Sequence, residues 1–421
     1  MSIHLSESDR RLLDGERGEG ARLAMRIVVR LAEATGVEEL MDVTQAHIDG
    51  CGLLTDASVA FAERLAAGGA RVCVPTTLNM GPLDLVGWRE HGIDEAFAAE
   101  AIRQADAYEA MGCIPTWTCA PYQGYLTPRF GQQVAWGESN AVVYANSVLG
   151  ARTNRYGDYI DICAAITGRV PRCGLHLAEN RRGQLLLRLM GFDEARLRDD
   201  LFYPVFGHLL GPLAGERIPV IEGLPPDATS DQLKALGAAA ASSGGLALFH
   251  AVGLTPEAPT RDAAFQGCEP EDVVEVRPGD WETALADLSS AEEGERLDVV
   301  VVGCPHFSYD EFRQLARLIE AEAGAAVHPD VAFVVVTSRQ ARALAESGGL
   351  LEPLAAFGAA VTLDTCVFHT PMVRPGAEVL MTNSGKCAYY APGELGVKVA
   401  FGTLGDCVRS AIAGRVRQEG R

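Results

Sequence analysis

The segment LDVVVVGCPHFSYDEFRQLARLIEAEAGAAVHPDVAFVVVTS, residues 297–338, decides the fold class of this chain. It opens with an apolar run at 297–303, continues with helical spacing at 311–324, and closes with a second apolar run at 331–338. A further helix is expected at 339–349 and a further strand at 359–365. Strands that alternate with helices in this way favour a doubly wound, mostly parallel α/β domain.

The same alternation occurs earlier in the chain. Apolar runs at 217–223 and 245–253 flank a helical segment at 230–244, which predicts a second parallel β-α-β unit. These boundaries divide the chain into three expected α/β domains, at residues 1–212, 213–296 and 297–421.

The first of these domains is expected to be rich in helices. A buried strand is expected at 71–77, and residues 113–154 read as a long loop, a kind of segment that usually has a function. Residues 254–296 read as acidic, proline-rich turns. Helices are expected at 6–36, 56–68, 94–112 and 158–168, and an exposed one at 181–200.

The composition excludes several classes of protein. Hydrophobic residues make up 48% of the 421 residues and charged residues 22%, which is typical of a folded globular protein. The formal net charge of −20 repels phosphate backbones, so we expect no nucleic-acid partner. Neither a spanning apolar stretch nor a signal peptide is evident, so we expect no membrane partner and a cytoplasmic location. The 11 cysteines are scattered along the chain, unlike those of a disulfide scaffold.

Cysteines follow two of the expected strands. Cys304 comes directly after the strand at 297–303, and Cys366 after the strand at 359–365. Ligands bind beyond the carboxyl ends of strands in open α/β sheets, so both thiols are expected to face one crevice. The alternative is that each is a small buried hydrophobic residue.

A third cysteine lies in the loop-rich region. Cys119, in TWTCAPY (116–122), is six residues from Cys113, which is not the spacing of a zinc knuckle or a redox dithiol. Thiolates from separate segments suit soft metal centres, especially iron–sulfur clusters. A site with three cysteine ligands leaves one position that can bind a substrate hydroxyl.

Small polar residues surround these cysteines in the sequence. The segments GESNAVVYANSVLGARTN (137–154) and TNSGKCAYY (382–390) combine hydroxyl and amide groups with a few cations, which suits a small carboxylate or phosphate. Ordinary turn chemistry would also explain them. His47 and His306 are further candidates, although a lone histidine is more often structural. The remaining cysteines are interpreted as structural: Cys51, Cys73, Cys163, Cys173, Cys268, Cys387 and Cys407.

Six short motifs together resemble the large, catalytic subunit of the aconitase X family, a branch of the aconitase superfamily of hydro-lyases. They occur in family order, and the block at 136–155 is the most specific of them. They are PTTLN (75–79), TWTCAPY (116–122), WGESNAVVYANSVLGARTNR (136–155), GCPHFS (303–308), DTC (364–366) and TNSGK (382–386).

The resemblance implies three α/β domains of aconitase type, with mostly parallel sheets around a central metal cleft. It implies Cys119, Cys304 and Cys366 as ligands of iron. A [2Fe–2S] cluster is favoured, with mononuclear iron or a four-iron cluster with a labile iron as alternatives. The candidate catalytic residues are His306 and His47. The candidate substrate-binding residues are Asn79, Ser139, Asn146, Arg152 and Lys386.

The implied reaction is a dehydration, in which the metal polarises the leaving hydroxyl while a base removes a proton from the neighbouring carbon. The expected small-molecule substrate is the hydroxy acid cis-3-hydroxy-L-proline, giving Δ1-pyrroline-2-carboxylate. Mevalonate 5-phosphate, giving anhydromevalonate phosphate, is the alternative substrate. Three cations, Arg152, Arg155 and Lys386, suffice for one carboxylate but are marginal for a phosphate. A non-catalytic iron–sulfur protein is a third interpretation.

A partner chain is also implied by the resemblance. In the superfamily, a further swivelling domain covers the cleft and carries a serine base. The chain offers no stretch for such a domain, so we expect a separate small subunit to supply it.

Overall fold

The structure is a computed structural model that describes residues 3–50 and 56–418. It divides into two compact units. Unit 1 comprises Met1–Arg182 with Thr255–Glu257, and unit 2 comprises Gly183–Leu254 with Ala258–Arg421. Among the described sheets, only the pair of β1 and β5 is antiparallel; the others are parallel, which confirms the expected α/β class.

Unit 1 is built around a short parallel sheet in the strand order β3-β2-β4. Helix α6 packs on β2 and against α2, and all but the first of its residues are buried. The expected helix at 6–36 is two helices, because the chain turns at Gly15 and Gly18, both of which have positive φ angles. The elements of unit 1 are α1 (Glu7–Leu13), α2 (Glu19–Thr35), β1 (Leu40–Asp42), β2 (Ala46–Ile48), α3 (Asp56–Ala67), β3 (Thr76–Leu78), α4 (Glu95–Ala110), β4 (Ala135–Trp136), α5 (Ser139–Ser147), α6 (Ile160–Thr167), β5 (Arg169–Pro171), η1 (Gly174–His176) and η2 (Ala178–Arg181).

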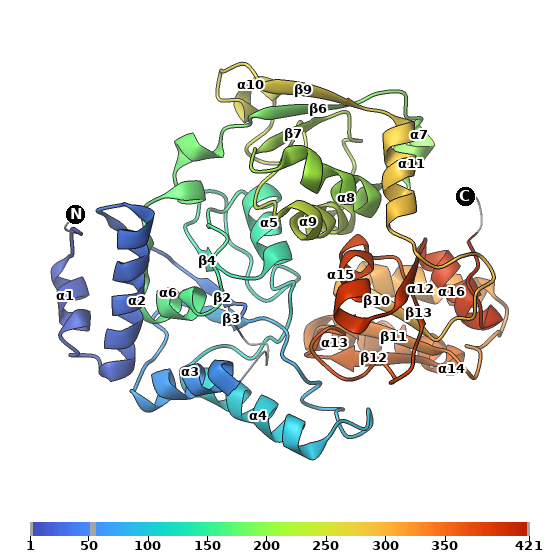
Figure 1. Cartoon of the computed structure of the whole chain (residues 1–421), viewed down its shortest axis with the longest axis horizontal. Coiled ribbons are helices and arrows are strands. Elements are labelled where there is room, and N and C mark those ends of the chain that lie inside the picture. Colours follow the sequence, from blue (N-terminus) through green and yellow to red (C-terminus); the bar gives the residue numbers. More distant parts are fainter. Residues whose placement is uncertain (1–2, 51–55, 419–421) are drawn as a thin grey trace. The chain divides into compact units, whose positions relative to one another are not determined.

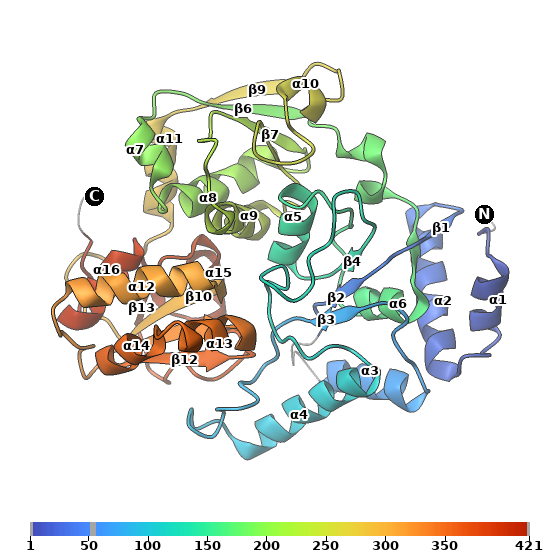
Figure 2. The same ribbon diagram turned by 180° about the vertical axis from the view of Figure 1, so that it is seen from behind.

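The first sheet of unit 2 has the order β8-β7-β6-β9, with α8 and α9 on one side of it (Figure 2). These two helices pack closely, because a Cβ atom at Gly207 would lie 2.3 Å from the Leu236 carbonyl oxygen. The elements are β6 (Leu185–Leu189), α7 (Glu194–Arg198), α8 (Phe202–Ala214), β7 (Pro219–Glu222), α9 (Ser230–Gly244), β8 (His250–Ala251), α10 (Arg261–Ala264), β9 (Asp272–Val276) and α11 (Pro278–Asp287).

The second sheet of unit 2 has the order β12-β11-β10-β13-β14 and is parallel throughout. The chain adds strands in one direction from β10 and then in the other direction from β13. The boundary between β10 and β13 is therefore a topological switch point, where doubly wound sheets form their binding crevice. The elements are β10 (Val299–Phe307), α12 (Tyr309–Ala321), β11 (Ala332–Thr337), α13 (Arg339–Ser347), α14 (Leu351–Phe357), β12 (Ala359–Leu363), β13 (Val379–Thr382), α15 (Gly385–Leu395), β14 (Lys398–Phe401) and α16 (Leu404–Ala413).

Several sequence-based assignments were wrong. The expected exposed helix at 181–200 contains β6, whose first three residues are fully buried between β7 and β9. A strand covered on both faces has a continuous apolar run that cannot be told from a helix by periodicity. The loop expected at 113–154 contains β4 and α5, and the turns expected at 254–296 contain β9 and α11. The strand expected at 71–77 forms only at its end, as β3.

No helix within residues 3–50 and 56–418 combines the length and apolar character needed to cross a bilayer.

Candidate active site

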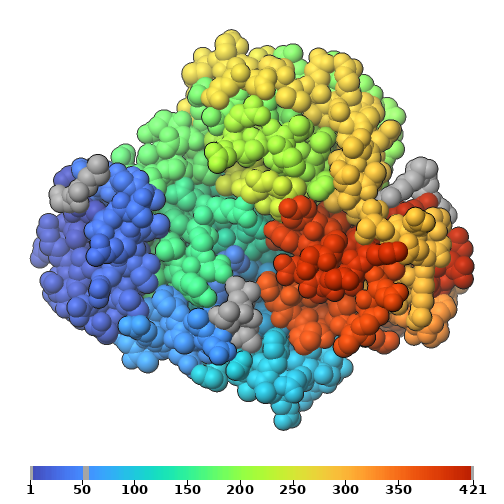
Figure 3. Space-filling view, in the orientation of Figure 1, coloured from blue at the N-terminus to red at the C-terminus, as the bar shows by residue number. Residues whose placement is uncertain are grey.

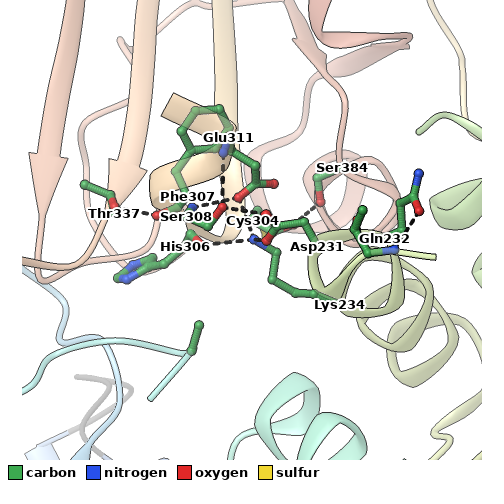
Figure 4. A network of polar contacts seen from close by, with 12 residues as sticks. Asp231, Gln232, Lys234, Cys304, His306, Phe307, Ser308, Glu311, Thr337 and Ser384 are labelled. Atoms are coloured by element: carbon green, nitrogen blue, oxygen red, sulfur yellow. Dashed lines mark hydrogen bonds and ion pairs between the residues drawn. The ribbon is translucent and has the colours of Figure 1, made fainter. Parts of the chain in front are cut away.

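The switch point of unit 2 is occupied by the segment that carries Cys304. The preceding residue, Gly303, has a φ of 95°, and a Cβ atom there would lie 2.1 Å from the Val336 carbonyl oxygen. Only glycine therefore fits before Cys304. The Ser384 hydroxyl, which also caps α15, donates a hydrogen bond to the Cys304 carbonyl oxygen (Figure 4). This contact joins Cys304 of β10 to the residue that caps α15 just after β13.

Two further thiols lie in the neighbourhood of Cys304. Cys387, in the first turn of α15, is fully buried and hydrogen-bonds to the Cys304 side chain. This hydrogen bond, together with burial and the nearby charges of Cys304 and Cys366, raises the pKa of Cys387 well above its ordinary value. Helix α15 lies at the surface of unit 2, in red in Figure 3. The strand predicted at 297–303 continues as β10 to Phe307, so Cys304 lies within the strand and not after it, whereas Cys366 does follow β12. Both thiols lie near Cys387, which the sequence interpretation treated as structural.

The loop that carries Cys366 is held from two sides. His306 is buried, and its Nε2 atom lies 2.9 Å from the Thr365 carbonyl oxygen, so Nε2 bears the hydrogen. Asp364 is fully buried with a φ of 61°, and the Arg339 guanidinium donates to both of its carboxylate oxygens at 2.7–3.0 Å. Both contacts fix the backbone just before Cys366.

In unit 1, polar side chains collect where the three parallel strands end. Asn79 follows β3, Asp49 follows β2 and Glu138 follows β4. The Asn79 amide donates to Asp49 Oδ1 at 2.5 Å, and Glu138 caps α5 by accepting from the Ala141 N–H at 2.6 Å. Asn79 Oδ1 is buried and has no hydrogen-bond partner among the described residues. This edge presents carboxylates and an amide.

Two buried titratable groups underlie this edge. Burial raises the pKa of Asp161 to about 7, although its carboxylate accepts hydrogen bonds from the backbone N–H groups of Asp49 and Ile162. Burial lowers the pKa of His47 to about 4, although the charge of Glu138 opposes the shift. His47 is therefore neutral near pH 7. Its Nδ1 atom lies 2.8 Å from the Thr77 hydroxyl.

Cys119 lies at the same edge of unit 1. The Thr118 N–H donates to the Leu78 carbonyl oxygen at the end of β3, and the Asn140 amide donates to the Cys119 carbonyl oxygen at 3.0 Å. Asn140 also donates to the Tyr122 hydroxyl. Cys119 is buried and lies in a loop that is hydrogen-bonded to the end of β3 through Thr118, not directly after a strand.

The other predicted substrate residues are spread over both units. In unit 1, the Ser139 hydroxyl bonds Glu138, and the Arg152 Nε atom is buried without a hydrogen-bond partner among the described residues. The side chain of Asn146 is hydrogen-bonded within the fold. Its amide nitrogen donates to the Thr153 carbonyl oxygen, and its amide oxygen accepts from the Thr153 N–H and from the Arg181 guanidinium. Lys386 lies in the first turn of α15 in unit 2. A substrate role for these residues stays a prediction.

The sequence interpretation missed Asp49 and Asp161. Asp49 follows the strand that carries His47, so the strand-end rule applied to the cysteines would have found it. Asp161 lies in an apolar helical segment and gives no comparable signal.

Within residues 3–50 and 56–418, no three His, Cys, Asp or Glu side chains are grouped so as to hold a metal ion. Cys304 and Cys366 belong to unit 2 and Cys119 to unit 1, so the ligand role of all three cysteines together stays a prediction.

Comparisons with known proteins identify relatives over the whole chain. Family models for aconitase X match three successive segments: its first domain at residues 2–179, its second at 186–286 and its third at 297–413. The crystal structure of the holo-form of Thermococcus kodakaraensis aconitase X is similar, with a TM-score of 0.87 and 30% identity, over 97% of this chain and all of that one.

Named enzymes are also similar to this chain. Cis-3-hydroxy-L-proline dehydratase of Pseudomonas aeruginosa is 47% identical over 98% of this chain and 70% of the relative. The enzyme of the same name from Hypocrea jecorina is 44% identical, over 98% of this chain and 69% of the relative. The phosphomevalonate dehydratase large subunit of Methanothermobacter thermautotrophicus is 38% identical, over 95% of this chain and 96% of the relative.

Proposed function

The chain belongs to the aconitase X family, and we propose that it is the large subunit of a hydro-lyase that dehydrates cis-3-hydroxy-L-proline. The observation that carries the proposal is the identity: both relatives named for this activity resemble the chain more than the phosphomevalonate dehydratase subunit does. In this reaction the C3–O bond breaks, the hydroxyl leaves as water, and the proton on C2 goes to a base. The resulting enamine tautomerises to Δ1-pyrroline-2-carboxylate.

The polar edge of unit 1 supports this choice of substrate. Asp49 and Glu138 lie there, and Asn79 bonds Asp49. Hydroxyproline carries a secondary ammonium group, which such carboxylates attract, whereas a phosphate group requires several cations. The edge therefore suits an amino acid better than a phosphorylated hydroxy acid.

Mevalonate 5-phosphate is the second candidate substrate. The chain and the archaeal phosphomevalonate dehydratase large subunit match over almost their full lengths, and the Arg152 Nε atom has no hydrogen-bond partner among the described residues. An anionic group of the substrate would satisfy that donor.

We further propose an iron centre with Cys304 and Cys366 as thiolate ligands, and with Cys119 as the third ligand that the sequence predicts. What supports the proposal is the chemistry of the donors, because thiolates are the ligands that iron–sulfur clusters require. The nuclearity favoured is [2Fe–2S], with mononuclear iron as the alternative. When bound, such a centre polarises the leaving hydroxyl.

The chain's own residues orient this chemistry. His306 fixes the loop before Cys366 through Thr365. His47 is neutral near pH 7, but its lowered pKa of about 4 and its complete burial make it a weak proton acceptor, so its catalytic role stays a prediction. The main base is proposed to be a serine of a small partner subunit, and the name "large subunit" carried by several relatives supports such a partner.

The test is an anaerobic assay of the chain mixed with its candidate small subunit. Cis-3-hydroxy-L-proline and mevalonate 5-phosphate are offered in parallel, and iron is determined in the same sample. Turnover of hydroxyproline alone supports the proposal. Turnover of mevalonate 5-phosphate alone would show that the second candidate is the substrate. Bound iron without either turnover would leave a non-catalytic iron-binding relative.

A further inference from the structure

A buried lysine lies behind the Cys304 segment. Lys234, on α9, is only 2% exposed, although lysine is almost never buried without a specific reason. Its ammonium nitrogen lies 2.5 Å from Glu311 Oε2 and 2.9 Å from Asp231 Oδ1, and it donates to the His306 carbonyl oxygen at 3.4 Å (Figure 4). All three acceptors belong to unit 2.

The partners of Lys234 converge on the residues that follow Cys304. The Ser308 hydroxyl donates to Asp231 Oδ2 at 2.6 Å, and the Ser308 N–H donates to Glu311 Oε2 at 2.7 Å. Ser308 and Glu311 also form the capping box that begins α12. Residues 306–308 are therefore tied to α9 through Lys234 and Asp231, and Lys234 also links α9 to Glu311 of α12.

The charges of the cluster keep Lys234 ionised. Burial would lower the pKa of Lys234, but the carboxylates of Asp231 and Glu311 outweigh burial and raise it. An ion cluster of this kind adds little net stability compared with apolar residues of the same volume, because desolvation offsets the attraction. The distinct contribution of the cluster is to hold three oxygen acceptors in fixed positions around the Lys234 ammonium group.

We propose that Lys234 is a positioning residue for the Cys304 thiol, acting through the backbone at His306 and the side chains of Ser308, Asp231 and Glu311. The inference rests on the proposed function in one respect, the role of Cys304 as a metal ligand. The position of the thiol itself is a property of the metal-free chain and can be measured there.

The test measures how fast individual thiols are alkylated in the metal-free full chain. The variants are Lys234→Met and the triple variant Lys234→Met/Asp231→Asn/Glu311→Gln, which leaves no unpaired charge. Peptide mass spectrometry after iodoacetamide treatment gives the rate at Cys304, with the exposed Cys268 as internal reference. The matched control is Lys398→Met, which breaks an exposed ion pair with Glu295 in the same unit.

We expect alkylation of Cys304 to become about tenfold faster in the triple variant, a change of about 1.4 kcal/mol, while Cys268 and the Lys398 control remain unchanged. Iron bound after anaerobic reconstitution should fall in parallel. A folded triple variant with the parental Cys304 rate would overturn the proposal, and so would failure of both variants to fold, because Lys234 would then serve stability alone. Faster alkylation combined with absent turnover would count against the proposed function and leave the positioning role standing.

Discussion

Replacing His47 by glutamine should remove one defined part of the acid sensitivity of unit 1, the part that comes from protonation of this buried ring. Burial lowers the pKa of His47 to about 4, compared with an ordinary value of about 6.5. The unfolded chain therefore binds more protons than the folded chain between these values. The stabilising contribution of the neutral ring is complete above pH 6.5 and is lost as the pH falls toward 4.

The expected magnitude follows from the window of pH. As the pH falls from about 7.5 to 5, the imidazole takes up a proton in the unfolded chain but not in the folded one. The difference acts over the roughly 1.5 pH units between the ordinary pKa of about 6.5 and pH 5, so the free energy of unfolding falls by about 2 kcal/mol. Glutamine cannot titrate, so the His47→Gln variant should lose about 2 kcal/mol less than the parent over this range. Asp161, whose pKa is raised to about 7, titrates equally in both proteins and cancels in the comparison.

Urea unfolding followed by tryptophan fluorescence is a suitable assay. The Trp136 ring lies 5.6 Å from the His47 ring, and a Trp281→Phe background removes the signal of unit 2. The exposed His4 provides the control variant His4→Gln. Equal losses of stability in the parent and His47→Gln would refute the reasoning, because they would show that His47 titrates alike in both states.

Three further predictions concern the buried carboxyl, the helix packing and the metal. As the pH rises from 4 to 8, the Asp161→Asn variant should gain up to about 4 kcal/mol of stability relative to the parent. The reason is that a carboxyl whose pKa is raised in the folded chain lowers the stability of the parent at pH values above the ordinary pKa. Urea unfolding at about pH 4 and about pH 8 measures this difference. Gly207→Ala should lower the free energy of unfolding by about 1–3 kcal/mol, because the new Cβ atom would overlap a carbonyl oxygen of α9, whereas Gly279→Ala in open space should be neutral or slightly stabilising. Cys366→Ser should reduce iron bound after anaerobic reconstitution to less than half, whereas Cys407→Ser, buried in α16, should leave it unchanged; equal iron in the two variants would exclude Cys366 as a ligand.

Elements with a clear period were predictable from the sequence. The helix expected at 230–244 has those bounds as α9, and the strand expected at 331–338 forms as β11. The helix at 181–200 was wrong because the apolar run of β6 is buried on both faces, so its local pattern carries no period of two. Which neighbours cover a segment is a property of the tertiary fold that local spacing does not encode.

In the candidate site, too, features set by the local sequence were predictable, and features set by the tertiary fold were not. The place of Cys366 after β12 was predictable from the apolar run at 359–365, whereas the end of β10 was placed four residues too early and Cys304 lies inside that strand. Cys387 was interpreted as structural because it lies inside a helix pattern, and only the close approach of α15 to β10 brings its thiol to Cys304. The cluster around Lys234 escaped prediction for a related reason: Lys234 and Asp231 on α9 each contact a residue 77 positions further along the chain, Glu311 and Ser308.

The two sheet edges differ in the kind of donor that they present. The thiols of Cys304, Cys366 and Cys387 gather in unit 2, whereas Asp49 and Glu138 follow strands of unit 1. A dehydration of an amino acid combines two tasks: a Lewis acid polarises the leaving hydroxyl, which the proposed thiolate-bound iron would supply, and carboxylates attract the substrate's ammonium group. A redox or regulatory iron–sulfur protein would need only the thiols. The carboxylates at the strand ends of unit 1 therefore favour the hydro-lyase over the non-catalytic interpretation, and they favour an amino acid over a phosphate ester as its substrate.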